Sequence, residues 1–240
     1  MKKKVLALFL AGALSMLGSV ALAEEYTPGQ RTYHVLGSIL NSDRHPVHLI
    51  VEQKIDMKGI VGSAKYNALP EAERTRINRT EYNEVKGMIG ERNIKMDGSG
   101  KIIQDITRFI KGQYWYSIDR KYKTYDRIPV IKGAMKPFAE NFVGWFNKVP
   151  VSGNDPATGF DYDKMTMGMR TLTFYYEKGG LEWKGYEVSP LPAFQIIEVS
   201  RDVDVENFFA DPGEGFRHYP DNVMRGVAER NLPHKKGKRR

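Results

Sequence analysis

The sequence predicts a mainly β fold with some α: a curved antiparallel sheet closed by an amphipathic helix. The first observation is an alternation over residues 46–59 that is typical of a half-buried strand. The second is an apolar period of three and four residues over 134–149, which indicates a helix. A sheet with one apolar face must bury it, and this helix is the obvious filler. The strand places Val47, Leu49, Val51, Ile55 and Met57 on one face and His48, Glu52, Lys54 and Asp56 on the other.

The helix predicted over 134–149 has a broad apolar face, and Pro137 suits its first turn. Lys136, Glu140, Asn141 and Lys148 lie elsewhere on its surface. The apolar face consists of Met135, Phe138, Ala139, Phe142, Trp145, Phe146 and Val149.

The other elements follow from turn residues and local texture. Residues 66–80 are polar, with Pro70 placed for a first turn, and are predicted as a short surface helix or an ordered loop. Residues 81–128 have a β texture, and MDGSGK (96–101) forms a hairpin turn because glycine supplies positive φ. Further predictions are a loop over 150–159, strands over 165–176, 183–188 and 194–199, and a short helix over 221–231. The total is about seven or eight mostly antiparallel strands.

The two ends of the chain carry targeting and charge signals. Residues 1–23 combine three lysines, an apolar run and Ala-Leu-Ala, which predicts a signal peptide cleaved after Ala23. The alternative, a membrane anchor, is disfavoured because the cleavage motif follows the apolar run at once. A lipoprotein would need a cysteine at the cut, and the chain has none. We therefore expect an exported, periplasmic protein with a single domain over 24–220.

Net charge does not indicate nucleic-acid binding, although it is +8. Removing the three lysines of the leader and the five basic residues of the tail leaves 29 basic against 29 acidic residues. The basic tail, residues 235–240, is expected to be disordered. It is either a solvated end or a weak contact with anionic lipid head groups.

The residues that could take part in catalysis or metal binding form no recognisable motif. Without cysteine there is no thiolate nucleophile and no cysteine-based metal site. His45 and His48 are close in sequence, but Pro46 separates them and no helix fixes their spacing. The spacing of the acidic residues in the loop 154–163 does not match that of a calcium-binding EF-hand. We therefore expect these side chains to stabilise turns, and a loose calcium site is the alternative. We expect no enzyme, no cofactor and no metal; an exported hydrolase or metal protein is a minor alternative.

One hairpin resembles a known family. GQYWYSIDRKYKTY (112–125) resembles the strand–turn–strand of the bacterial outer-membrane lipoprotein-sorting, LolA-like family, with Tyr116, Ile118 and Asp119 on the matching positions. RNIKMDGSGKIIQDI (92–106) and FQIIEVSRDVDVENFFADPGEGF (194–216) are similar to further family segments. The resemblance covers residues 47–216 and implies an incomplete barrel, or half-barrel, over an apolar cavity that takes acyl chains. It places Tyr116 and Ile118 on the concave side, so that Trp115 points outward.

These observations predict a non-enzymatic binding protein that holds a lipid, a lipoprotein acyl chain or another amphiphile in an apolar concave cavity. Helix 134–149 would serve as lid or plug. Met165, Met167 and Met169 are expected on one strand face, either in the core or on an adaptable surface. The alternative function is a cell-envelope protein-interaction module with a dry core. The expected ligand-binding residues are Val51, Ile55, Tyr116, Ile118, Phe138, Phe142, Trp145, Phe146 and Met167.

Overall fold

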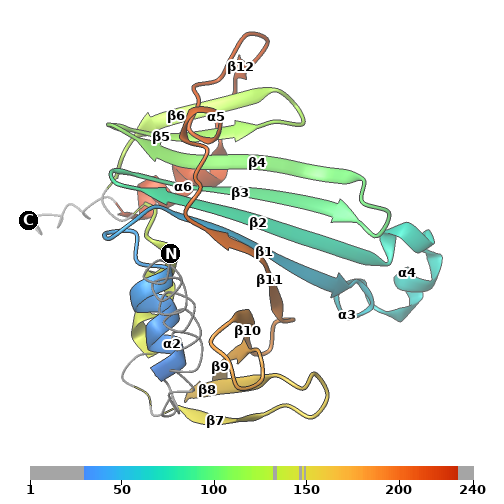
Figure 1. Ribbon diagram of the computed structural model, residues 1–240. Coiled ribbons are helices and arrows are strands. Elements are labelled where there is room, and N and C mark those ends of the chain that lie inside the picture. The colour runs from blue at the N-terminus through green and yellow to red at the C-terminus, as the bar shows by residue number, and fades with distance from the viewer. Residues whose placement is uncertain (1–29, 132–133, 146–147, 149, 232–240) are drawn as a thin grey trace, which may run out of the picture.

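A computed structural model describes residues 30–131, 134–145, 148 and 150–231. Their strands form one curved sheet in the order β12-β6-β5-β4-β3-β2-β1-β11-β10-β9-β8-β7, which is not closed into a barrel (Figure 1). The strands are β1 (Val47–Asp56), β2 (Thr75–Val85), β3 (Met88–Asp97), β4 (Ile102–Lys111), β5 (Tyr114–Asp119), β6 (Thr124–Pro129), β7 (Val151–Asn154), β8 (Asp161–Met167), β9 (Arg170–Tyr176), β10 (Trp183–Val188), β11 (Phe194–Ser200) and β12 (Arg217–His218).

Strand β1 joins two meanders into this sheet. It is the first strand of the meander β1–β6 and pairs there with β2. On its other side it pairs with β11, the last strand of the meander β7–β11. These pairings are antiparallel, whereas the two-residue strand β12 adds to β6 in parallel. The predicted mainly β fold with a curved antiparallel sheet is therefore confirmed.

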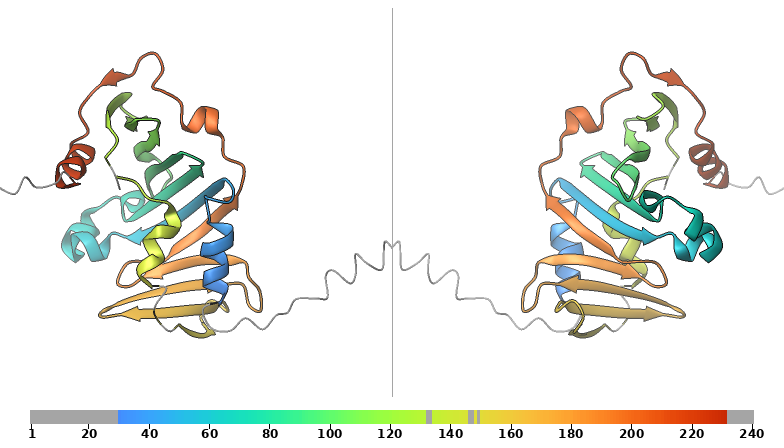
Figure 2. Two further views of the ribbon diagram at one scale, coloured as in Figure 1. Left: turned by 90° about the vertical axis from the view of Figure 1, so that its left-hand side faces the viewer. Right: turned by 90° about the vertical axis from the view of Figure 1, so that its right-hand side faces the viewer.

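Helices lie on both sides of the sheet, and α6 and α5 lie on opposite sides (Figures 1 and 2). We call the side that carries Val47, Leu49 and Val51 the helix-bearing face, because residues of η1, η3 and α6 pack there. The opposite face is covered around β4 and β5 by the segment that contains α5. The helical elements are α2 (Gln30–His34), the π-helix η1 (Val35–Ile39), α3 (Lys58–Val61), α4 (Ser63–Ala68), the 3₁₀ helices η2 (Glu71–Glu73) and η3 (Phe138–Trp145), α5 (Val205–Phe208) and α6 (Asn222–Asn231).

The helix predicted over 134–149 is shorter than expected and of a different type. The structure has the 3₁₀ helix η3 over Phe138–Trp145. Aromatic residues and Gly144 have weak intrinsic helix propensity, so tertiary packing decides this segment. The first amide of η3, that of Phe138, donates a hydrogen bond to the buried Glu84 carboxylate on β2. This contact fixes the start of η3 on the sheet.

Three other segments correct the sequence prediction. Residues 75–80 are the first half of β2 rather than helix or loop, because they pair in continuous register with β1 and β3. The expected loop after residue 150 contains β7, which pairs with β8. The expected strand 165–176 is a hairpin, since Gly168 has φ of +61° and turns β8 into β9. Met169 lies in this turn and not on a shared strand face.

The faces of β5 are also reversed relative to the prediction. Directly paired residues share a face, and the row through Trp115 runs from Ile110 and Ile89 to Glu84 and finally Val47. Trp115 therefore lies on the helix-bearing face. Consecutive strand residues point to opposite faces, so Tyr116 lies on the other one.

Candidate functional site

A cavity of about 370 Å³ lies on the helix-bearing face between the sheet, the segment before η3, and α6. This volume falls within the range of small-molecule sites. Apolar and aromatic side chains share its wall with a few charged ones, which is the pattern of an amphipathic site. Its lining residues are Tyr82, Ile89, Glu91, Arg108, Trp115, Ala134, Met135, Lys136, Asn141, Val223, Met224 and Val227.

Helix α6 covers one side of the cavity through apolar contacts. Met224 is fully buried and packs with Trp115 and Ile128 of the sheet. Trp115 is only 4% exposed, although the sequence left it without a covering segment. Val227 and Ala228 of α6 pack against the same cluster, as do Ala134 and Met135. The segment that covers Trp115 is therefore α6.

A buried carboxylate on β6 anchors this C-terminal segment. Asp126 accepts two hydrogen bonds from the Arg225 guanidinium and one from the Asp221 amide, each 2.9 Å long. His218 Nε2 lies 3.0 Å from the same carboxylate. Burial alone would raise the pKa of Asp126, but the bonds from Arg225, the Asp221 amide and His218 outweigh it and hold the pKa below its usual range.

The start of α6 is tied to the sheet by a second carboxylate. Asp221 precedes the helix and accepts a 2.9 Å hydrogen bond from the Met224 amide, which is the geometry of an N-cap. Its other oxygen accepts from Arg108 Nη2 on β4 at 2.9 Å and from the Ser117 hydroxyl on β5. Against the effect of burial, these bonds lower the pKa of Asp221. Arg108 is thus committed to Asp221 at the edge of the cavity.

Four predicted ligand-binding residues belong instead to a filled aromatic core. Val51, Phe138, Phe142 and Trp145 are buried in one cluster on the helix-bearing face. The Phe142 ring lies 5.2 Å from Phe174 and 5.5 Å from Tyr186, in edge-to-face contacts. Here η3 occupies the space that the sequence assigned to a ligand.

The other predicted ligand-binding residues are dispersed. Tyr116 and Ile118 lie on the opposite face in a cluster with Phe109, Phe208 and Phe209, so the structure does not bring them to Val51. Ile55 is partly buried near the end of β1, and Met167 is 39% exposed at the end of β8. Met165, on the same strand, is buried in the core. Phe146 lies outside the described residues.

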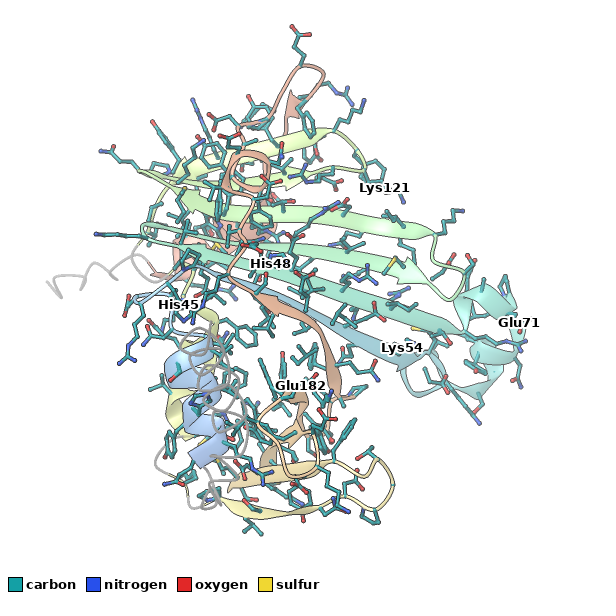
Figure 3. The ribbon with its side chains drawn as sticks, in the orientation of Figure 1. His45, His48, Lys54, Glu71, Lys121 and Glu182 are labelled. Atoms are coloured by element: carbon teal, nitrogen blue, oxygen red, sulfur yellow. The ribbon has the colours of Figure 1, made fainter. Side chains whose placement is uncertain are left out.

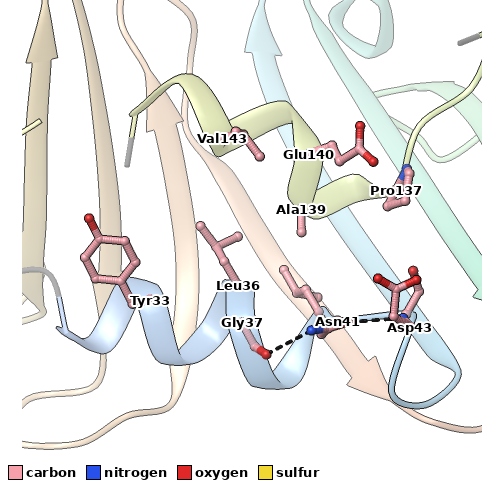
Figure 4. A pocket seen from close by; sticks show the side chains of 11 residues that line it. Tyr33, Leu36, Gly37, Asn41, Asp43, Pro137, Ala139, Glu140 and Val143 are labelled. Atoms are coloured by element: carbon pink, nitrogen blue, oxygen red, sulfur yellow. Dashed lines mark hydrogen bonds between the residues drawn. The ribbon is translucent and has the colours of Figure 1, made fainter. Parts of the chain in front are cut away.

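A shallower groove of about 230 Å³ runs between the N-terminal helices and η3. Leu36 on η1 faces Ala139 and Val143 on η3 across this groove (Figure 4). Glu140 and Asp43 lie at one end of it and Tyr33 at the other. The cavity under α6, at about 370 Å³, is larger than this groove and is the better candidate of the two.

His45, His48 and the acidic loop are explained by local structure. His45 lies in the loop ahead of β1 (Figure 3), with Nε2 2.6 Å from the Ser38 carbonyl oxygen and Nδ1 2.9 Å from that of Pro46. His48 Nδ1 lies 2.7 Å from Asn83 Oδ1. In the acidic loop, Asp155 accepts bonds from Ala157 and Thr158, as turn chemistry predicts. In the part of the chain that the structure describes, no three His, Asp or Glu side chains are grouped to hold a metal ion.

The residues that build the cavity were only partly visible in the sequence. The notable signal was Trp115, which the sequence left unexplained between two other aromatic residues. Helix α6 was predicted, but its apolar residues Met224 and Val227 could not be assigned to a partner. Ile89 and Glu91 share one face of β3, one apolar and one charged, and gave no separate signal.

Comparison with known proteins gives no family. No protein-family model matches the chain, and no curated protein does. An uncharacterized conserved protein from Thermus thermophilus is 10% identical, with 79% of this chain and 100% of that chain covered and a TM-score of 0.42. Two structures of PNGF-II, in the C2 and P21 space groups, are 9% and 8% identical with TM-scores of 0.27 and 0.30.

The alignments cover 78% and 77% of this chain, which spans 33% of the PNGF-II chain. These similarities are too weak to transfer a fold or a function. Among the described residues, no helix combines the length and the apolar character needed to cross a bilayer.

Proposed function

We propose that this protein is an exported, periplasmic, non-enzymatic binding protein that holds an amphiphile, such as a lipid or the acyl chain of a lipoprotein. The observation that carries the proposal is the cavity under α6, whose wall combines Trp115, Met135 and Met224 with charged residues at its edge. Apolar burial stabilises such a complex by roughly 25 cal/mol per Å² of surface removed from water. Methionine adapts to varied apolar partners, so two methionines suit a site for flexible chains.

The sequence supports the same proposal independently. The leader-like residues 1–23 fit export, and the hairpin 112–125 resembles the LolA-like lipoprotein-sorting family. In this reading η3 and α6 together close the helix-bearing face, and the incomplete barrel provides the cavity wall. The basic tail, residues 235–240, would add a weak contact with anionic membranes. Both ends of the chain lie outside the described residues.

A second candidate function is a cell-envelope protein-interaction module with a dry core. The observation that favours it is the filling of the larger core by Phe138, Phe142 and Trp145. In that case the cavity under α6 would be a packing defect, and binding would occur on the outer surface. Ligand titration separates the two candidates.

The Val223→Glu variant is expected to weaken ligand binding without harming the fold. Val223 lines the cavity but is 64% exposed, so its replacement costs little stability, and a carboxylate beside the apolar wall disfavours an apolar ligand. We expect Kd for the neutral dye Nile red to rise about tenfold, which corresponds to about 1.4 kcal/mol. The measurement is a fluorescence titration of the wild type and the variant.

The matched control is Val151→Glu, at a valine on β7 that is 63% exposed and does not line the cavity. This control is expected to bind the dye as the wild type does. Equal effects of the two substitutions, or the absence of saturable dye binding to the wild type, would contradict the proposed cavity.

A further inference from the structure

The charged residues at the edge of the cavity carry information about the ligand's head group. Three of its lining side chains are ionic: Glu91 on β3, Arg108 on β4 and Lys136 just before η3. The three charges differ in how far other groups of the protein already compensate them. A ligand is recognised by the charges that remain available, so the argument depends on their partners.

Arg108 is not available to a ligand. Its Nε and Nη2 atoms both donate to Asp221 Oδ2, at 3.3 and 2.9 Å, and both side chains are largely buried. A ligand anion that took Arg108 would leave the Asp221 carboxylate short of its partner at the start of α6. Breaking such a pair is costly, so Arg108 acts as part of the α6 anchor.

Glu91 places its carboxylate at the cavity. Its direct cross-strand neighbours are Tyr82 and Arg108, and Arg108 is turned toward Asp221. Among the described residues Glu91 forms no hydrogen bond or ion pair through its carboxylate. Tyr82 and Trp115 line the same cavity, and aromatic rings beside a carboxylate favour an ammonium group. Glu91 therefore suits the positive part of a head group.

Lys136 supplies a complementary positive charge from the other wall. Its ammonium lies 4.0 Å from Glu140, one turn further along, and both side chains are largely exposed. Exposed pairs of this kind contribute little, so Lys136 can exchange this partner for a ligand at small cost. Asn141 lines the same cavity and can donate through its amide. Lys136 and Asn141 suit a phosphate group.

We propose that the cavity selects a zwitterionic amphiphile, with Glu91 binding its ammonium group and Lys136 and Asn141 binding its phosphate. The inference rests on the proposed function and adds the class of head group. A ligand with only a negative head group would meet the unpaired Glu91 carboxylate, and a purely cationic one would leave Lys136 unused. A singly charged competitor therefore gains an attractive contact with one of these two side chains and meets a repulsive contact with the other.

The test displaces Nile red from the full mature chain with three single-chain amphiphiles below their micelle concentrations: dodecylphosphocholine, dodecyl phosphate and dodecyltrimethylammonium. We expect the wild type to prefer dodecylphosphocholine about tenfold over each competitor. Glu91→Gln is expected to abolish the preference over dodecyl phosphate, and Lys136→Gln the preference over dodecyltrimethylammonium. The matched control, Glu206→Gln on α5, changes an exposed carboxylate on the opposite side of the sheet and is expected to keep both preferences.

The outcomes distinguish the head-group inference from the proposed function. If Nile red binds and the three amphiphiles displace it within twofold of one another, the head-group inference is overturned and the binding function stands. Preference for dodecyl phosphate would also overturn it. If neither the dye nor any amphiphile binds saturably, the proposed function itself fails.

Discussion

The Asp126→Asn variant is expected to lower the free energy of unfolding by roughly 3 kcal/mol. The Asp126 side chain is completely buried and holds Arg225, His218 and the Asp221 amide together. An amide in its place cannot accept all of these hydrogen bonds and leaves the Arg225 charge without its partner. Chemical denaturation at pH 7 measures the loss. Hydrogen exchange is expected to show the largest loss of protection in α6, with Trp115 becoming accessible to a fluorescence quencher.

The effect has a defined pH dependence. Because the pKa of Asp126 is lowered by folding, its ionised form contributes stability above the unfolded pKa near 3.9, and this is lost as pH falls through the folded pKa. The difference between wild type and Asp126→Asn is therefore expected to shrink below about pH 4. The control is Asp211→Asn, at an exposed carboxylate 3.8 Å from Lys111, which is expected to have little effect. Equal stability of Asp126→Asn and wild type at pH 7 would contradict the anchor.

The second large effect is expected for Phe142→Ala, which should lower the free energy of unfolding by about 3–5 kcal/mol. Phe142 is 4% exposed and its ring contacts Phe138, Phe174 and Tyr186. Removal of the ring leaves a cavity that the neighbouring rings can fill only partly. Thermal and urea unfolding provide the measurement.

The adjacent residue provides the control for Phe142. Val143 is 55% exposed on the same helix, so Val143→Ala is expected to change the free energy of unfolding by less than about 0.5 kcal/mol. If Phe142→Ala costs less than about 1 kcal/mol, η3 is not part of the core in the way described. The space would then be open to a ligand, as the sequence predicted.

The sequence predicted the strands whose faces differ strongly in polarity. β1, β10 and β11 follow the expected ranges, since alternation reports burial of one face. The sequence did not predict strands whose two faces have a similar polarity. Residues 75–80 are polar except for Ile77, yet they pair as a strand because their neighbours β1 and β3 fix the register.

The site was harder to predict because it depends on contacts between distant segments. Tyr114, Trp115 and Tyr116 are consecutive, so the sequence could not tell which face of β5 meets the helices. The structure decides it through α6, which is more than 100 residues away in the chain and covers Trp115. The resemblance assigned Tyr116 to the ligand side, but Phe208 and Phe209 cover it on the opposite face. Phe138 and Phe142 were expected to face a ligand, and in the structure they fill the core.

The most direct test of the account is native mass spectrometry of the protein purified from cells without detergent. The account predicts a population with the added mass of one amphiphile, and fragmentation of that complex should release a zwitterionic lipid or lipid-derived chain. The Val223→Glu variant should lose this population, and Val151→Glu should retain it. A wild-type protein that shows only the unliganded mass, and takes up no added amphiphile, would contradict the central claim that the cavity under α6 is a binding site.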